Sequence, residues 1–66
     1  MNQRFTLADM LRCAIREVVM REKVYPRWVA SGKMKAETAE REIACMQAIA
    51  AHLEAEYQWE KGEDNV

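Results

Sequence analysis

The sequence has little of what most catalytic, secreted or membrane proteins require. Its 66 residues include one His, one Pro, two Gly and two Cys. Two cysteines are too few for a secreted disulfide framework. No apolar run approaches the roughly 18 residues of a membrane span, and the first residues lack the apolar core of a signal peptide. We therefore expect a cytoplasmic protein.

Catalytic and metal sites are also not expected. There is no Ser-His-Asp arrangement and no glycine-rich loop to hold phosphate. Cys13 and His52 fall at a similar level as a possible nucleophile and base, but only Glu56 is placed to orient the imidazole. Cys45 and His52 lie two helical turns apart, roughly 10 Å by helical rise, which is too far for one metal ion. The sequence predicts no enzyme and no cofactor, and both thiols are expected to be buried and structural.

What the sequence does have is helical periodicity, first over residues 6–31. Thr6 and Asp9 match an N-terminal capping box, flanked by the apolar pair Phe5 and Met10. Pro26 predicts a bend at residues 25–26, as a kink or a short break, and Gly32 suits the left-handed position after a helix. One side of this helix is apolar at about 100° per residue. Its members are Leu7, Leu11, Ala14, Val18, Tyr25 and Val29.

A turn at residues 31–35 then leads to a second helix over residues 36–59, and the polar tail 60–66 is expected to fray. Apolar residues of the second helix recur at heptad spacing, at Ala39, Ile43, Met46, Ala50, Leu53 and Tyr57. A second row on the opposite flank consists of Ala44, Ala48, Ala51 and Ala55. That row either reflects helix propensity or forms a flat face for another helix.

The predicted fold is all-α, a single domain made of an antiparallel two-helix hairpin with a Pro-kinked first helix. A chain this short buries only about 60% of its unfolded surface, so two copies are expected to close a four-helix bundle. The contact between copies is either the alanine row or a strip of Met10, Cys13, Met20 and Trp28. The residues expected in the core and dimer contact are Leu7, Leu11, Val18, Ile43, Met46, Leu53 and Tyr57.

Charge is divided unevenly along the chain. Residues 1–35 carry a net charge of +5 and residues 36–66 a net charge of −6. This asymmetry either joins the two helices or steers the basic one toward an acidic partner. A stripe of basic residues also admits nucleic-acid binding, although no helix-turn-helix spacing is present. The role of this stripe stays open; it consists of Arg12, Arg16, Lys23 and Arg27.

The bend between the helices combines aromatic and basic side chains, which are favoured anchors of protein interfaces. Tyr25 and Val29 are expected to close the core there, while Trp28 either covers the bend or contacts a partner. The candidate partner-binding residues are Tyr25, Arg27, Trp28, Lys33 and Met34.

Residues 24–34, VYPRWVASGKM, and residues 39–46, AEREIACM, resemble the quorum-sensing anti-activator family of Pseudomonas phages, which belongs to a group of short phage and prophage proteins. The resemblance covers roughly residues 7–56, and Lys35 stands where related sequences often have a capping Ser or Thr. It implies a small helical homodimer, made early in infection, that blocks a LuxR-type quorum-sensing activator of the host. It also implies a second target, the type IV pilus assembly ATPase, whose inhibition excludes further phage.

The resemblance assigns neither interface to particular residues. The expected function is inhibition by covering a functional surface of a host protein. Two alternatives are a small phage transcriptional regulator that binds DNA and a structural or assembly protein of the phage particle.

Overall fold

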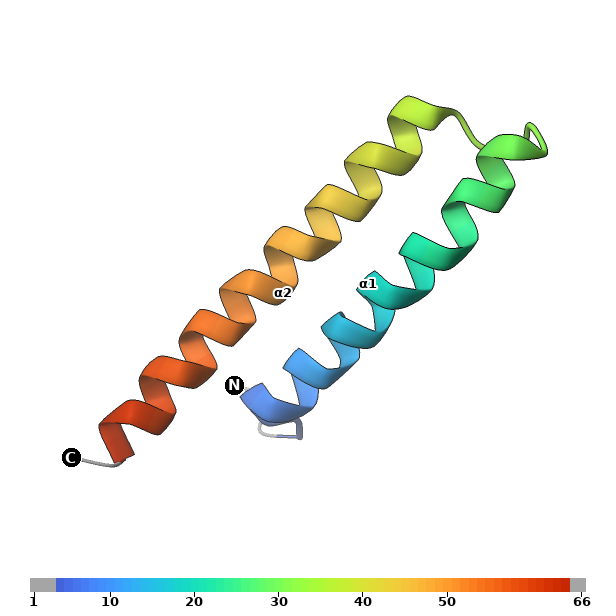
Figure 1. Cartoon of the computed structure of the whole chain (residues 1–66). Coiled ribbons are helices and arrows are strands. Elements are labelled where there is room, and N and C mark those ends of the chain that lie inside the picture. The colour runs from blue at the N-terminus through green and yellow to red at the C-terminus, as the bar shows by residue number, and fades with distance from the viewer. Residues whose placement is uncertain (1–3, 65–66) are drawn as a thin grey trace.

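The computed structural model describes residues 4–64, and these form two α-helices. Helix α1 spans Leu7–Ala30 and helix α2 spans Ala36–Asp64. They lie side by side in antiparallel orientation, joined by the turn at residues 31–35 (Figure 1). The molecule is elongated, with extents of 51 × 21 × 18 Å. The all-helical hairpin predicted from the sequence is confirmed.

Helix α1 begins with the predicted capping box. The Asp9 N–H donates to Thr6 Oγ1 over 3.0 Å, and the Thr6 N–H donates to Asp9 Oδ2 over 3.1 Å. Two N–H groups at the start of the helix are thereby satisfied. The backbone and side-chain hydrogen bonds from Thr6, together with the nearby Arg12 guanidinium, hold the pKa of Asp9 below its ordinary value.

Helix α1 continues through Pro26 and ends at the predicted position. The alternative of a short break at residues 25–26 is wrong, because Leu7–Ala30 is one continuous helix; a kink there stays a prediction. Gly32 adopts a φ of 81°. Its N–H donates to the Val29 carbonyl over 3.1 Å, and the Lys33 N–H donates to the Trp28 carbonyl over 2.8 Å. This pair of bonds is a Schellman motif, which a residue with positive φ makes possible.

The end of α2 differs from the prediction. The helix was expected to stop at residue 59 with a frayed tail at 60–66, but it runs to Asp64; residues 65 and 66 lie outside the described residues. Gly62 does not end it, because among the described residues only Gly32 has a positive φ. The Lys61 ammonium also lies 5.9 Å from the Tyr57 ring centre, a favourable pair one turn apart. The last turns of α2 therefore extend past the start of α1 (Figure 1).

The core between the helices is one residue row wide. Among the described residues only Ala14 and Ala39 are buried, with exposed fractions of 5% and 6%. The residues predicted for the core and dimer contact are all half-buried: Leu7, Leu11, Val18, Ile43, Met46, Leu53 and Tyr57. Whether any of them contacts a second copy stays a prediction.

Arg21 occupies a place in this row that the sequence analysis did not assign. Its Nη1 donates to the Glu42 carbonyl over 2.8 Å and its Nε donates to Glu17 over 3.0 Å. Its guanidinium also lies 5.7 Å from the centre of the Tyr25 ring. The hydrogen bond that Arg21 donates to Glu17, together with the negative charges of Glu17 and Glu42, raises the pKa of Arg21. Arg21 therefore sets the register of the two helices, with Glu42 level with it.

Candidate protein-interaction surfaces

Among the described residues, eight large apolar side chains are exposed on the surface of the hairpin. A single exposed apolar residue is ordinary, but neighbouring ones mark contact sites for other molecules. Here their exposed fractions range from 39% to 67%. The residues are Phe5, Met10, Ile15, Val19, Met20, Trp28, Ile49 and Trp59.

One side of the hairpin carries an apolar hollow that both helices line. Its volume is about 340 Å³. Its single carboxylate, Glu17, already accepts a hydrogen bond from Arg21. We call this side the methionine face, defined by Met10, Cys13, Met46, Ile49 and Leu53. Met20 and Trp28 continue the same side of α1 toward the bend, because the spacing of 18 residues from Met10 to Trp28 equals five helical turns. Soft thioether side chains suit an adaptable contact surface.

The opposite side of the hairpin carries a smaller and more polar hollow. Its volume is about 270 Å³, and α1 contributes Ile15 and Val19 to it. The α2 side contributes small residues together with Gln47 and Glu54. The Gln47 amide donates to Glu22 over 2.9 Å across the two helices. A partner that covered this side would have to desolvate these polar groups.

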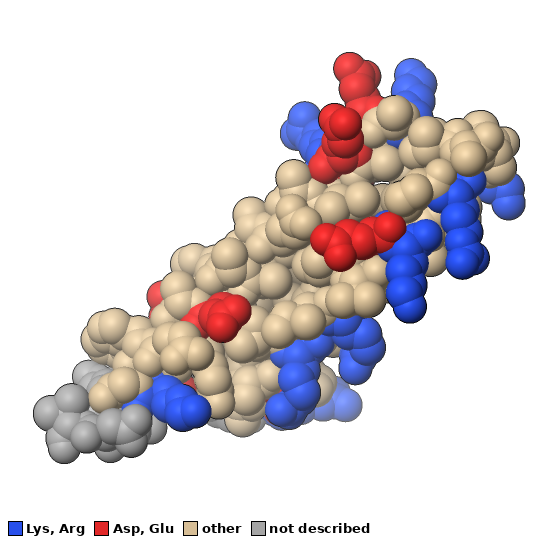
Figure 2. All heavy atoms as spheres, viewed as in Figure 1, with Lys and Arg blue, Asp and Glu red and all other residues tan. Residues whose placement is uncertain are grey.

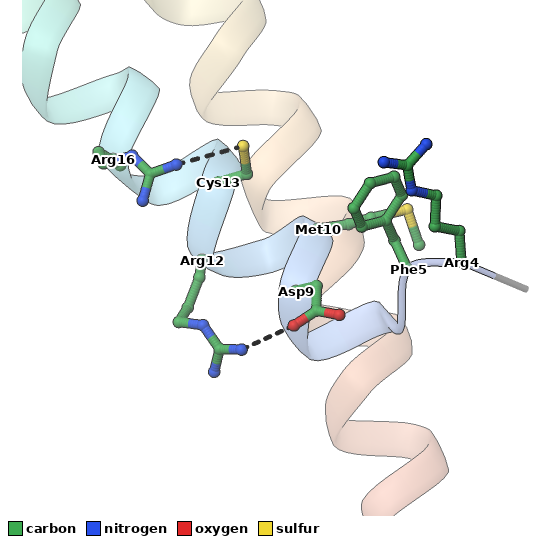
Figure 3. A pocket seen from close by; sticks show the side chains of 7 residues that line it. All are labelled: Arg4, Phe5, Asp9, Met10, Arg12, Cys13 and Arg16. Atoms are coloured by element: carbon green, nitrogen blue, oxygen red, sulfur yellow. Dashed lines mark hydrogen bonds and ion pairs between the residues drawn. The ribbon is translucent and has the colours of Figure 1, made fainter.

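A third hollow lies at the start of α1 (Figure 3). Its volume is about 530 Å³, with Phe5, Met10 and Cys13 as its apolar members. Arg4, Arg12 and Arg16 surround them, and Asp9 lies on the same side. The Arg4 guanidinium lies 5.2 Å from the centre of the Phe5 ring. Apolar side chains edged by guanidinium groups fit a partner that offers both apolar and carboxylate groups.

Side chains in this hollow also bond to one another. Arg12 forms an ion pair with Asp9 at 2.8 Å, and both side chains are well exposed. The Arg16 Nη2 lies 3.6 Å from the Cys13 sulfur and donates a weak hydrogen bond to it. Because exposed ion pairs contribute little stability, Arg12 can exchange Asp9 for another carboxylate at small cost.

At the bend between the helices, residues 25–34, the structure brings together two of the five candidate partner-binding residues. The rings of Tyr25 and Trp28 are stacked with centroids 5.5 Å apart and an interplanar angle of 25°. Tyr25 and Met34 are half-buried, whereas Arg27, Trp28 and Lys33 are exposed. Tyr25 therefore belongs to the core edge, and the exposed three form the outer surface of the bend.

The basic stripe is exposed along its whole length, at Arg12, Arg16, Lys23 and Arg27. Lys and Arg side chains gather along the edge of the molecule that α1 forms (Figure 2). Arg12 is engaged with Asp9 and Arg16 with Cys13. The stripe thus lies on the side of α1 away from α2 and takes no part in joining the helices.

The expectation that both thiols are buried is wrong. Cys13 and Cys45 are free and exposed. A two-helix hairpin buries one row of each helix, and both cysteines lie beside that row. His52 is exposed on α2. Within residues 4–64, no group of three or more His, Cys, Asp and Glu side chains is arranged to hold a metal ion.

Two further residues of these surfaces were missed by the sequence analysis. Ile49 lines the methionine face although it lies outside the heptad row. Its signal was the spacing from Met46 to Ile49 to Leu53, which continues one helix face at three and four residues. Arg4 lines the hollow at the start of α1, and no sequence pattern marked it.

Neither helix in the described part of the chain has an apolar stretch that could cross a lipid bilayer. Comparisons with protein-family models, with curated proteins and with solved structures found no match.

Proposed function

We propose that this protein is a phage-encoded inhibitor that binds a host protein and covers its functional surface. The supporting observation is the set of eight large apolar side chains that stay 39–67% exposed on a two-helix hairpin. Such a surface suits stable contact with other proteins, because neighbouring exposed apolar groups are costly to keep in water.

The resemblance of residues 7–56 supplies the targets and the setting of this proposal. The targets are a LuxR-type quorum-sensing activator and the type IV pilus assembly ATPase, in the cytoplasm of the infected bacterium. The inhibitor acts as a homodimer and consumes no substrate. Binding the first target blocks quorum sensing, and binding the second excludes further phage.

The outer surface of the bend is the proposed contact with the host protein. Trp28 offers an aromatic face whose stacking on Tyr25 limits the entropy lost on binding. Arg27 and Lys33 place positive charge beside it. Trp and Arg are the residue types that contribute most often to interface hot spots.

Titration calorimetry of the purified protein against each target tests the proposal. We expect the double variant Arg27→Ala, Trp28→Ala to weaken binding about 30-fold or more, the effect of removing an interface hot spot. The control variant Arg41→Ala removes an exposed arginine from α2, away from the bend, and should bind as the wild type does. An unchanged affinity of the bend variant, with helicity intact, would exclude the bend as the contact. Failure of the wild type to bind either target would refute the target assignment.

The exposed basic stripe supports a second candidate, a small regulator that binds DNA. Mobility-shift titration against random DNA at several salt concentrations separates the two functions. A protein that neutralises four phosphates should lose affinity with a log–log salt slope of about −3.6. An inhibitor of host proteins should show no shift at micromolar concentration.

A further inference from the structure

We propose that a second copy of this chain packs on the methionine face, with α1 of each protomer antiparallel to α2 of its partner. This inference rests on the homodimer of the proposed function and specifies its contact surface and helix pairing. It also determines where the two bends lie in the assembly.

The choice of face follows from what each side of the hairpin would bury. The methionine face offers Met10 and Met20 from α1 and Ile49 from α2, all large and exposed. Its one central carboxylate is already paired with Arg21. The opposite side offers large apolar groups from α1 alone, and its hollow includes the Gln47 amide and the Glu54 carboxylate. Covering the hollow of the methionine face therefore buries more large apolar side chains and desolvates fewer polar groups than covering the opposite hollow.

The choice of pairing follows from the charges of the two helices. Two flat hairpins can stack about a twofold axis parallel to the helices, which sets α1 on the partner's α2. A twofold axis across the helices instead sets α1 on α1 and α2 on α2. Within its bounds, α1 has five Lys or Arg residues and three Asp or Glu residues. Helix α2 has two Lys or Arg residues and eight Asp or Glu residues. The first arrangement pairs opposite charges, and the second juxtaposes like charges at an energetic cost.

The chain ends show this complementarity locally. Arg21 lies level with Glu42, so Glu56 lies level with residue 7 and Glu60 lies just beyond the start of α1. Glu56 follows Ile49 by one heptad and Glu60 follows Glu56 by one turn, so both continue the methionine face of α2. In the proposed pairing they meet the partner's hollow of apolar and arginine side chains at the same level. The last turns of α2, which extend past the chain's own α1, then gain a surface to pack against.

The same axis brings both bends to one end of the four-helix bundle. The two copies of Arg27, Trp28 and Lys33 then form one basic and aromatic end surface, and the remaining end carries the chain termini. The alternative axis would place the bends at opposite ends. The distance between the two bends therefore distinguishes the pairings.

Sedimentation velocity on two variants of matched exposure tests the face. Ile49 and Val19 are 46% and 47% exposed and lie on opposite sides of the hairpin. We expect Ile49→Lys to raise the dimer dissociation constant about 30-fold or more, as loss of an interface hot spot does, and Val19→Lys to leave it unchanged. The reverse result, or a monomeric wild type, overturns the inference.

Because a dissociated chain can also unfold, a charge exchange provides an independent test. Arg12→Glu should weaken the dimer. Adding Glu56→Arg in the same chain should restore it, because the new glutamate of each copy then faces the new arginine of its partner. Weakening without restoration would contradict the contact between the hollow and the end of α2.

A distance measurement tests the pairing. A spin label at Lys33→Cys, in a chain with Cys13→Ala and Cys45→Ala, reports the separation of the two bends by double electron–electron resonance. Bends at one end of a bundle with helices about 8–10 Å apart give a label distance below about 30 Å. A distance approaching the 51 Å length of the hairpin overturns the pairing. Neither measurement involves a host protein, so a dimer that meets these results yet binds no target would refute the proposed function and leave this inference standing.

Discussion

Replacing each of the two glycines by alanine should change stability in opposite directions. Gly32 has a φ of 81°, and a Cβ built there meets nothing within 4 Å. The cost of Gly32→Ala is therefore backbone strain alone, about 1–2 kcal/mol for an L-residue in the left-handed region. Reduced freedom of the unfolded chain offsets roughly 0.4–1 kcal/mol of that cost. The net expectation is a loss of about 1 kcal/mol, or a fall in Tm of about 4–8 °C for a chain of this size.

Gly62 is the matched control, because it lies inside α2 and a Cβ there also meets nothing within 4 Å. Alanine is favoured over glycine within a helix by about 0.5–1 kcal/mol, so Gly62→Ala should raise the Tm. Thermal unfolding followed by circular dichroism at 222 nm measures both variants. Protein concentrations must be equal, since association shifts the apparent Tm. A Gly32→Ala variant at least as stable as the wild type would refute the assigned role of the left-handed turn.

Two further predictions concern the core and the helix start. Ala14→Leu should lower the free energy of unfolding by about 1–3 kcal/mol, because the buried row has no room for the added carbons. Ala48→Leu, on the exposed alanine row, should change the free energy of unfolding in urea by less than about 0.5 kcal/mol. Equal effects of the two variants would contradict a core made of one row from each helix. The fold lowers the pKa of Asp9, so its stabilisation is complete above the unfolded value of about 3.9 and is lost as the pH falls through the lower folded value. The Tm difference between wild type and Asp9→Asn should therefore shrink between pH 5 and pH 2, and a constant difference would contradict the capping role.

The features that the sequence predicted well depend on few neighbouring residues. The capping box requires Thr6 and Asp9 alone, and the end of α1 requires a glycine at position 32. The core row from Leu7 to Tyr57 follows from helical periodicity, because two helices have few ways to pack their apolar sides against each other. These features depend on neighbouring residues in the sequence, so they form regardless of what the helices pack against.

The features that were missed depend on contacts between the helices or on how little the fold buries. Arg21 lies in an apolar row because its guanidinium reaches a carbonyl 21 residues away. Cys13 and Cys45 are exposed because one row of each helix is all that the hairpin covers. The end of α2 was missed because a glycine in a polar tail does not by itself stop a helix. The kink, the dimer and the host targets remain predictions, since they concern bending and other molecules.

The hydrogen bonds between the two helices lie toward one end of the hairpin. Within the described residues, Arg21 bonds to Glu42 and Gln47 bonds to Glu22, and both links lie in the half of the hairpin nearer the turn. From these links toward the chain termini, half-buried apolar side chains line the contact between α1 and α2. We therefore expect the two helices to separate more readily at the end that carries Leu7 and Tyr57 than at the end near the turn. Amide hydrogens should exchange faster toward that end, and a partner that wedges the helices apart would enter there.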